Sequence, residues 1–96
     1  MIRGFGSQLA EDVFHGVSSK IARRIPQTIW RVARRKMDMV NTARELRDLL
    51  APPANRLEAL KGDWHGYHSI RINDQFRVVF RWMNGNASDV DIVDYH

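Results

Sequence analysis

The residues Asp94, Tyr95 and His96 follow one another at the end of a segment, 88–95, whose side chains alternate as in a half-buried β-strand. All three are ionisable, and imidazole is the side chain best suited to moving protons near neutral pH. The ends of chains are usually frayed and chemically bland. A strand that brings these groups to its tip therefore predicts one edge of a site, whose other members must come from elsewhere in the chain.

The two strands before this segment are predicted by the same alternation over 68–72 and 76–83. A slip of one residue in their pairing would move every side chain to the other face of the sheet. To turn both apolar faces inward, Ile70 must lie opposite Val78, and residues 73–75 must form the loop. Asn and Asp in this loop tolerate left-handed turns.

This register places Arg71 directly opposite Arg77 on the outer face of the sheet. Like charges that face each other across a strand pair are unfavourable, by about tenths of a kcal/mol when exposed. The charge pattern alone leaves two interpretations open, because the two guanidinium groups either splay into water or hold an anion between them. We expect both to be unpaired.

In the next hairpin we expect residues 84–86 to form the loop and Phe80 to pair with Val90. Arg81 then lies opposite Asp89 and forms an ordinary surface ion pair. Arg77 lies diagonal to Tyr95 in this register and so joins it to Arg71. His96 has the parity of the inward-facing residues, and it reaches this cluster only if the chain bends after Tyr95.

The first half of the chain has helical periodicity. Ser7 is a predicted N-cap for a short helix that stops at Gly16. A longer helix is expected over 26–40, followed by a second piece over 42–50 that begins with a capping box at Thr42. Weak alternation at 2–5 and 57–60 indicates two further short strands. Helices followed by strands predict an α+β domain, with the N-terminal helices packed on one face of a mainly antiparallel sheet.

The bulk composition predicts one domain, 1–96, with 15 Lys and Arg against 11 Asp and Glu and a pI near 10.1. There is no cysteine, so disulfides and thiolate sites are excluded. The absence of a long apolar run and of a signal-peptide pattern predicts a cytoplasmic protein with no membrane partner. The four histidines lack the spacing of metal ligands and no acidic cluster is present, which predicts chemistry without a metal or another cofactor.

Other candidate groups each have a structural alternative. Lys61, in the loop before the hairpin, can reach the same site or simply be solvated. Asn73 and Gln75 are turn residues whose amides can also read a base edge, and Trp64 is the aromatic residue most suited to touch a ligand. The predicted helix carries a basic ridge that suits phosphate groups but equally suits a solvated face: Arg23, Arg24, Arg31, Arg34, Arg35 and Lys36.

Three runs of the sequence resemble the HigB toxins, which belong to the RelE superfamily of messenger-RNA endonucleases. The runs cover 55–63 (NRLEALKGD), 67–77 (YHSIRINDQFR) and 92–96 (IVDYH), and the opening residues 1–5 (MIRGF) are also similar. The resemblance implies the RelE-like microbial RNase fold. It also implies a toxin that cuts messenger RNA in the ribosomal A site, without a metal, by attack of a ribose 2′-hydroxyl on the adjacent phosphate.

The resemblance also implies roles for individual residues. Arg77 would stabilise the phosphate, Lys61 would assist electrostatically or in proton transfer, and the acid–base group would be Asp94, Tyr95 and above all His96. RNA contacts would come from Arg56, Glu58, Arg71 and Asn73. Some members have a histidine where this chain has Glu58, so either Glu58 acts as the base or that role passes to Lys61 and His96.

The partners that the resemblance implies are a HigA-like helix-turn-helix antitoxin, the ribosome with its messenger RNA, and operator DNA reached indirectly through the antitoxin. Composition alone would favour a non-catalytic basic module that binds RNA or the ribosome, or a protein-interaction domain with a basic helix. The cluster of Arg71, Arg77 and Tyr95 favours catalysis, and the resemblance favours it further.

Overall fold

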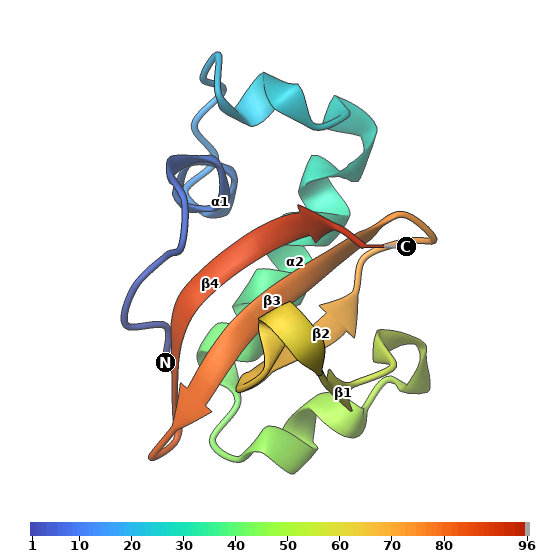
Figure 1. Ribbon diagram of the computed structural model, residues 1–96. Helices are drawn as coiled ribbons and strands as arrows, with labels where there is room; N and C mark the ends of the chain where they lie inside the picture. Colours follow the sequence, from blue (N-terminus) through green and yellow to red (C-terminus); the bar gives the residue numbers. More distant parts are fainter. Residues whose placement is uncertain (96) are drawn as a thin grey trace.

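The computed structural model describes residues 1–95 and has the α+β architecture that the sequence predicts (Figure 1). Helix α2 (Trp30–Thr42) runs behind a four-stranded antiparallel sheet, and helix α1 (Gln8–Phe14) lies beside the β4 edge, where it contacts both α2 and β4. The sheet has the order β1-β2-β3-β4, with the bounds β1 Glu58–Ala59, β2 Tyr67–Arg71, β3 Phe76–Met83 and β4 Asn86–Asp94.

Helix α1 begins and ends where its sequence signals place it. The Ser7 hydroxyl oxygen accepts a hydrogen bond from the Ala10 amide at 3.1 Å, which satisfies one of the free donors of the first turn. The same hydroxyl donates to Asp91 of β4 at 2.6 Å, so the cap also fastens the helix to the sheet. Gly16, with φ of 72°, follows the helix and turns the chain away.

The long helix starts later than predicted, because residues 27–29 form a short 3-10 turn before α2. The predicted capping box at Thr42 is wrong. Thr42 is the last residue of α2, and its hydroxyl donates to the Asp38 carbonyl at 3.1 Å. A capping box does form one turn later, where Glu45 and Asp48 open the 3-10 helix Leu46–Leu50. No helix in the part of the chain described is long and apolar enough to cross a membrane.

The core lies between α2 and the inner face of the sheet. Burial of each large apolar side chain stabilises the fold by about 1.5–3 kcal/mol. Trp30 and Trp82 pack against this core at its margin. The largest fully buried apolar side chains of this core are Phe80, Met37, Leu49, Ile70, Val40, Val78 and Val90.

The β2–β3 hairpin has the predicted register. Ile70 pairs with Val78 and Arg71 with Arg77, and residues 73–75 form the loop. The Asn73 side-chain oxygen accepts hydrogen bonds from the amides of residues 75 and 76, at 2.9 and 2.7 Å. Asn73 is therefore a turn residue in the first place, as its position in the sequence indicates.

The β3–β4 hairpin differs from the prediction at its tip. The turn has two residues, Asn84 and Gly85, with φ of 52° and 78°, the pattern of a type I′ turn. The expected pairing of Phe80 with Val90 is not part of the ladder, since the register shifts between Val79 and Arg81. A β-bulge at Asp89, where φ is 50°, takes up the extra residue.

Below the bulge the predicted register returns, with Val78 opposite Ile92 and Arg77 opposite Val93. The predicted ion pair between Arg81 and Asp89 forms at 3.5 Å despite the shift. The expected first strand is reduced to two isolated parallel bridges, in which Ile2 and Phe5 lie alongside β4.

Candidate functional site

The outer face of the sheet, turned away from α2, brings together the residues that the register argument places there. Arg71 and Arg77 are direct cross-strand partners. The guanidinium carbon of Arg77 lies 5.9 Å from the centre of the Tyr95 ring, close enough for a cation–π contact. The predicted cluster of Arg71, Arg77 and Tyr95 is therefore confirmed as a geometric arrangement.

Arg77 is held by two hydrogen bonds, so the expectation that it is unpaired is wrong. Its Nη1 donates to Oε1 of Glu58 at 2.8 Å, and its Nη2 donates to the carbonyl of Arg56 at 2.8 Å. The Arg77 side chain is only 13% exposed, against 48% for Glu58. Its Nε is buried and has no partner in residues 1–95. The guanidinium thus has a set orientation, fixed through both of its terminal nitrogens.

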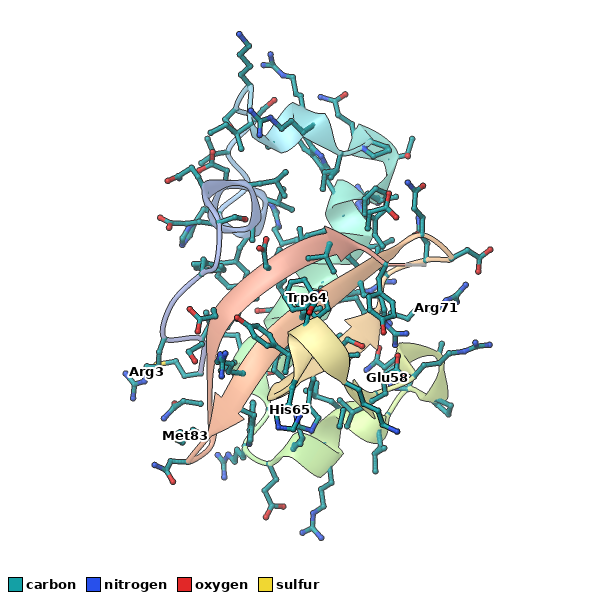
Figure 2. All side chains as sticks on the ribbon, viewed as in Figure 1. Arg3, Glu58, Trp64, His65, Arg71 and Met83 are labelled. Carbon is teal, nitrogen blue, oxygen red and sulfur yellow. The ribbon has the colours of Figure 1, made fainter. Side chains whose placement is uncertain are left out.

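Arg71 is also paired, although in a different way. Its guanidinium forms an ion pair with Asp74, whose side chain is 98% exposed. A pair with such a carboxylate contributes little, since water and salt screen it. Arg71 is therefore readily available to another anion, whereas Arg77 is already oriented. Figure 2 shows Glu58 and Arg71 near each other at the β1–β2 side of the sheet.

The carbonyl that receives Arg77 is positioned by a buried turn. The 3-10 turn Pro53–Asn55 ends at Arg56, which has φ of 47° in the left-handed region. Asn55 is fully buried, and its amide nitrogen donates to the carbonyls of Leu49 and Ala51 at 3.2 and 3.4 Å. These bonds fix the conformation of the 3-10 turn, and this conformation directs the Arg56 carbonyl toward Arg77.

The same Asn55 side chain accepts a hydrogen bond from the Lys36 ammonium of α2 at 2.5 Å. Lys36 is 6% exposed, so its assignment to an exposed basic ridge is wrong. Burial lowers the pKa of Lys36, and the nearby positive charges of Arg35 and Arg71 lower it further. Helix α2 is thereby linked through Asn55 to the turn that supports Arg77.

The tail is fastened to the β2–β3 loop through one residue. The Gln75 carbonyl accepts from the Tyr95 amide at 2.8 Å, and the Gln75 side-chain amide donates to Asp94 at 2.9 Å. These bonds hold the end of β4 against the loop. Tyr95 lies on the Arg77 side of the sheet, whereas Asp94 pairs with the inward-facing Phe76. His96 lies outside the described residues, so its predicted place in the acid–base group, and the bend that it requires, remain predictions.

Lys61 lies in front of the short 3-10 helix Gly62–Trp64 and is exposed. Its ammonium forms no ion pair within residues 1–95, and no described contact joins it to Arg77. Trp64 lies over the outer face of the sheet in Figure 2. The Trp64 ring packs edge-on against the Tyr67 ring, with 5.1 Å between the ring centres. The guanidinium carbon of Arg81 lies 4.5 Å from the centre of the same Tyr67 ring. Trp64 and Arg81 thus form a boundary to the site rather than its centre.

The sequence argument did not connect Lys36 and Asn55 with the site, and it named Glu58 through the resemblance without its bond to Arg77. Lys36 follows Ala33 by three residues and precedes Val40 by four, which places it on the buried stripe of α2. Glu58 pairs with Ser69 across β1–β2, one strand from Arg77, so extending the register by one strand would have found its partner. Asn55 had no such signal beyond its position after two prolines.

No group of three or more His, Asp or Glu side chains in the described range is placed to hold a metal ion. The sequence-based expectation of chemistry without a metal or other cofactor remains a prediction.

Solved structures of bacterial proteins have the same arrangement of elements. A chain of the YoeB–YefM complex from Staphylococcus aureus matches 100% of this chain and 98% of its own length, with a TM-score of 0.60 and 17% identity. YafQ from Escherichia coli strain BL21(DE3) matches 92% of this chain and 84% of its own length, with a TM-score of 0.53 and 15% identity. The fold is therefore the RelE-like fold of small bacterial toxins.

The family is shown by sequence. Residues 11–96 match the model of the HigB-like toxin family, described as the RelE-like toxin of the type II toxin–antitoxin system HigB. Toxin HigB-1 of Vibrio cholerae serotype O1 is 42% identical over 65 residues, which are 68% of each protein. Endoribonuclease HigB of Proteus vulgaris is 34% identical over 61 residues, 64% of this chain and just under two thirds, 65%, of that protein. The chain belongs to the HigB-like toxins, which confirms the resemblance noted in its sequence.

Proposed function

We propose that this protein is the toxin of a type II toxin–antitoxin pair and an endoribonuclease that cuts messenger RNA in the ribosomal A site. The observation that carries the proposal is the arrangement of Arg77. It is held by Glu58 and by the Arg56 carbonyl, it lies against Tyr95, and it faces Arg71 across the strand pair. A site of this kind suits a phosphate group that gains negative charge during the reaction.

The proposed reaction is attack of a ribose 2′-hydroxyl on the adjacent phosphorus. The 2′-oxygen loses its proton to a base, the bond from phosphorus to the 5′-oxygen breaks, and that oxygen gains a proton from an acid. The products are a 2′,3′-cyclic phosphate and a free 5′-hydroxyl. Arg77 stabilises the pentacoordinate phosphorane through its positive charge, and Arg71 leaves the exposed Asp74 for a phosphate oxygen.

The proton transfers are assigned to Glu58 from its place beside Arg77 and to the C-terminal residues from the family resemblance. Glu58 presents a half-exposed carboxylate beside Arg77 and takes the proton from the 2′-hydroxyl. Asp94, Tyr95 and His96 form the acid group, in which His96 gives a proton to the leaving 5′-oxygen, and Lys61 adds positive charge at the mouth of the site. Asn73 keeps its amide nitrogen free for an RNA base, because the turn uses only its oxygen.

The proposed partners follow from the family. They are a HigA-like helix-turn-helix antitoxin, the ribosome and its messenger RNA, and operator DNA reached through the antitoxin, with no membrane partner and a place in the cytoplasm. The alternative function is a non-catalytic basic module that binds RNA or the ribosome, which the net charge of +4 favours.

The test compares Arg77→Ala with Arg81→Ala, a matched loss of an arginine from the same face of the sheet. Each is expressed in growing cells, and new 5′ ends of messenger RNA are mapped on the ribosome. We expect cleavage to fall about 100- to 1,000-fold in Arg77→Ala and to stay close to wild type in Arg81→Ala. Arg77→Lys should recover little, since an ammonium cannot hold Glu58 and the Arg56 carbonyl in the same fork.

The alternatives give different results in the same experiment. Undiminished cleavage by a folded Arg77→Ala would show that the proposed site is wrong. Wild-type protein that sediments with ribosomes but produces no new 5′ ends would establish the binding module. A chain without His96 tests the acid, because cleavage equal to wild type would remove His96 from the mechanism.

A further inference from the structure

The helices carry a second cationic region on the other side of the molecule from the sheet's outer face. Helices α1 and α2 contact each other and are joined by residues 15–29, which arch above the sheet in Figure 1. Two adjoining hollows lie between them, with volumes of about 300 and 400 Å³, and both are lined by Arg31 and Arg34. We call this region the helical groove.

The groove is lined by apolar as well as cationic side chains. Val13, Val17 and Trp30 line the first hollow, and Phe14 and Arg35 line the second. Val17 is 48% exposed, so the first hollow has an accessible apolar side chain at its edge.

The arginines of the groove are without acidic partners. Arg31, Arg34 and Arg35 form no ion pair within residues 1–95, although Asp38 lines the second hollow. On one helix, like charges three and four residues apart repel each other. The Arg34 guanidinium lies against the chain at Gly16, where an added Cβ would be 2.7 Å from its Nη1. It therefore lies along the groove, although its side chain is exposed.

We propose that the helical groove binds an acidic, amphipathic helical segment of the antitoxin. Carboxylates of that segment would pair with Arg31, Arg34 and Arg35, and one of its apolar side chains would enter the hollow beside Val17 and Trp30. Charge complementarity selects an acidic partner, and an apolar hollow selects a side chain of a protein helix. An RNA backbone would use the arginines but not the apolar lining.

The inference rests on the antitoxin partner of the proposed function and not on its nuclease chemistry. The groove is built from α1 and α2, and Arg77 lies on the face of the sheet that these helices do not cover. A partner held in the groove would therefore leave Arg77 and Glu58 uncovered. Antitoxin binding and cleavage should then be separable by mutation, which allows either proposal to fail alone.

The experiment compares the double variant Arg31→Glu/Arg34→Glu with Lys20→Glu/Arg24→Glu, which has the same change of charge on exposed residues that do not line the groove. The probe is the full-length antitoxin encoded beside the toxin, and its Kd is measured by calorimetry with each intact toxin. Cleavage of messenger RNA is measured separately on purified ribosomes without antitoxin. Val17→Asp tests the apolar part of the groove, and thermal unfolding confirms that each variant is folded.

We expect Arg31→Glu/Arg34→Glu to raise the antitoxin Kd at least 100-fold and Val17→Asp to raise it at least 10-fold. Lys20→Glu/Arg24→Glu should change the Kd less than threefold, and cleavage without antitoxin should stay within threefold for all of them. Antitoxin affinity that is equal for the two double variants would overturn the proposal. Intact antitoxin binding with a loss of ribosomal cleavage in Arg31→Glu/Arg34→Glu would overturn it in favour of an RNA contact. If Arg31→Glu/Arg34→Glu does not fold, Arg31→Gln/Arg34→Gln replaces it, and an unchanged Kd in that variant overturns the proposal equally.

Discussion

The outer face of the sheet and the helical groove both carry arginines, but these arginines differ in exposure and in hydrogen-bond partners. Arg77 on the outer face is 13% exposed and donates to both Glu58 and the Arg56 carbonyl. Arg31 and Arg34 in the helical groove are exposed and form no ion pair in the described structure. An arginine that the protein already orients needs no reorganisation when charge develops on a substrate. An arginine without partners must be ordered on binding, and it suits a ligand that brings its own carboxylates.

The first test of this difference removes the turn that orients Arg77 and leaves Arg77 itself unchanged. Asn55→Ala deletes the acceptor of the buried Lys36 ammonium and the donor to Leu49 and Ala51. We expect the free energy of unfolding to fall by about 3 kcal/mol, because a buried charge loses its acceptor. Cleavage by the protein that remains folded should fall as well, since the Arg56 carbonyl is no longer held.

The measurements are urea unfolding and ribosomal cleavage below the unfolding temperature. Asn86→Ala, at the tip of the β3–β4 hairpin, is the matched control, and it should lower the free energy of unfolding by less than about 1 kcal/mol. Full cleavage by folded Asn55→Ala would show that Arg77 keeps its orientation without the turn.

The second test separates the two roles that Glu58 has beside Arg77. Glu58→Gln keeps a side-chain oxygen for the guanidinium but removes the charge and the basicity. If Glu58 is the base, cleavage should fall about 100-fold, while the unfolding free energy changes by less than about 1 kcal/mol. Asp74→Asn removes the exposed partner of Arg71 in the same way and should change cleavage less than threefold. Equal cleavage by the two variants would leave Glu58 only the task of orienting Arg77.

The third and smallest effect concerns pH, to which arginine side chains do not respond in the accessible range. His68 lies on β2 and faces the inner side of the sheet with its cross-strand partner Phe80. Burial lowers the pKa of His68, and its Nδ1 has no hydrogen-bond partner in the described chain. The imidazole of His68 has a higher pKa in the unfolded chain than in the folded protein, so on acidification the unfolded chain is protonated first. The free energy of unfolding should therefore decrease as pH falls below about 6.5. The decrease should end once the pH is below the folded-state pKa.

His68→Phe keeps a ring beside Phe80 and removes the titration, so its urea midpoint should fall less between pH 7.5 and pH 5 than that of the wild type. Parallel curves for the two proteins would assign the acid sensitivity to other groups.

The sequence predicted the pairing of Arg71 with Arg77 because two buried apolar faces leave a single register for β2 and β3. The alternating pattern could not predict the tip of the next hairpin in the same way. There the register depends on left-handed backbone at Asn84, Gly85 and Asp89, and such conformations leave no trace in an alternation of apolar and polar residues.

The prediction from helical periodicity failed at Lys36 for a different reason. Periodicity places Lys36 among the buried residues of α2, but a lysine is usually expected at the surface. Its buried acceptor, Asn55, comes from a turn 19 residues away, which local patterns do not reveal. The roles assigned to Lys61, Asp94, Tyr95 and His96 came from the family resemblance and remain predictions.

The bulge at Asp89 has a consequence for how this hairpin can vary. It cancels the one-residue offset of the Asn84–Gly85 turn, so Arg77 faces Val93 just as it would beneath a three-residue loop without a bulge. A chain with one residue added after Gly85 and Asp89 deleted should keep the same pairing around Arg77. The far end of the hairpin can therefore change its length and shape among relatives while the half that bears Arg77 keeps its alignment.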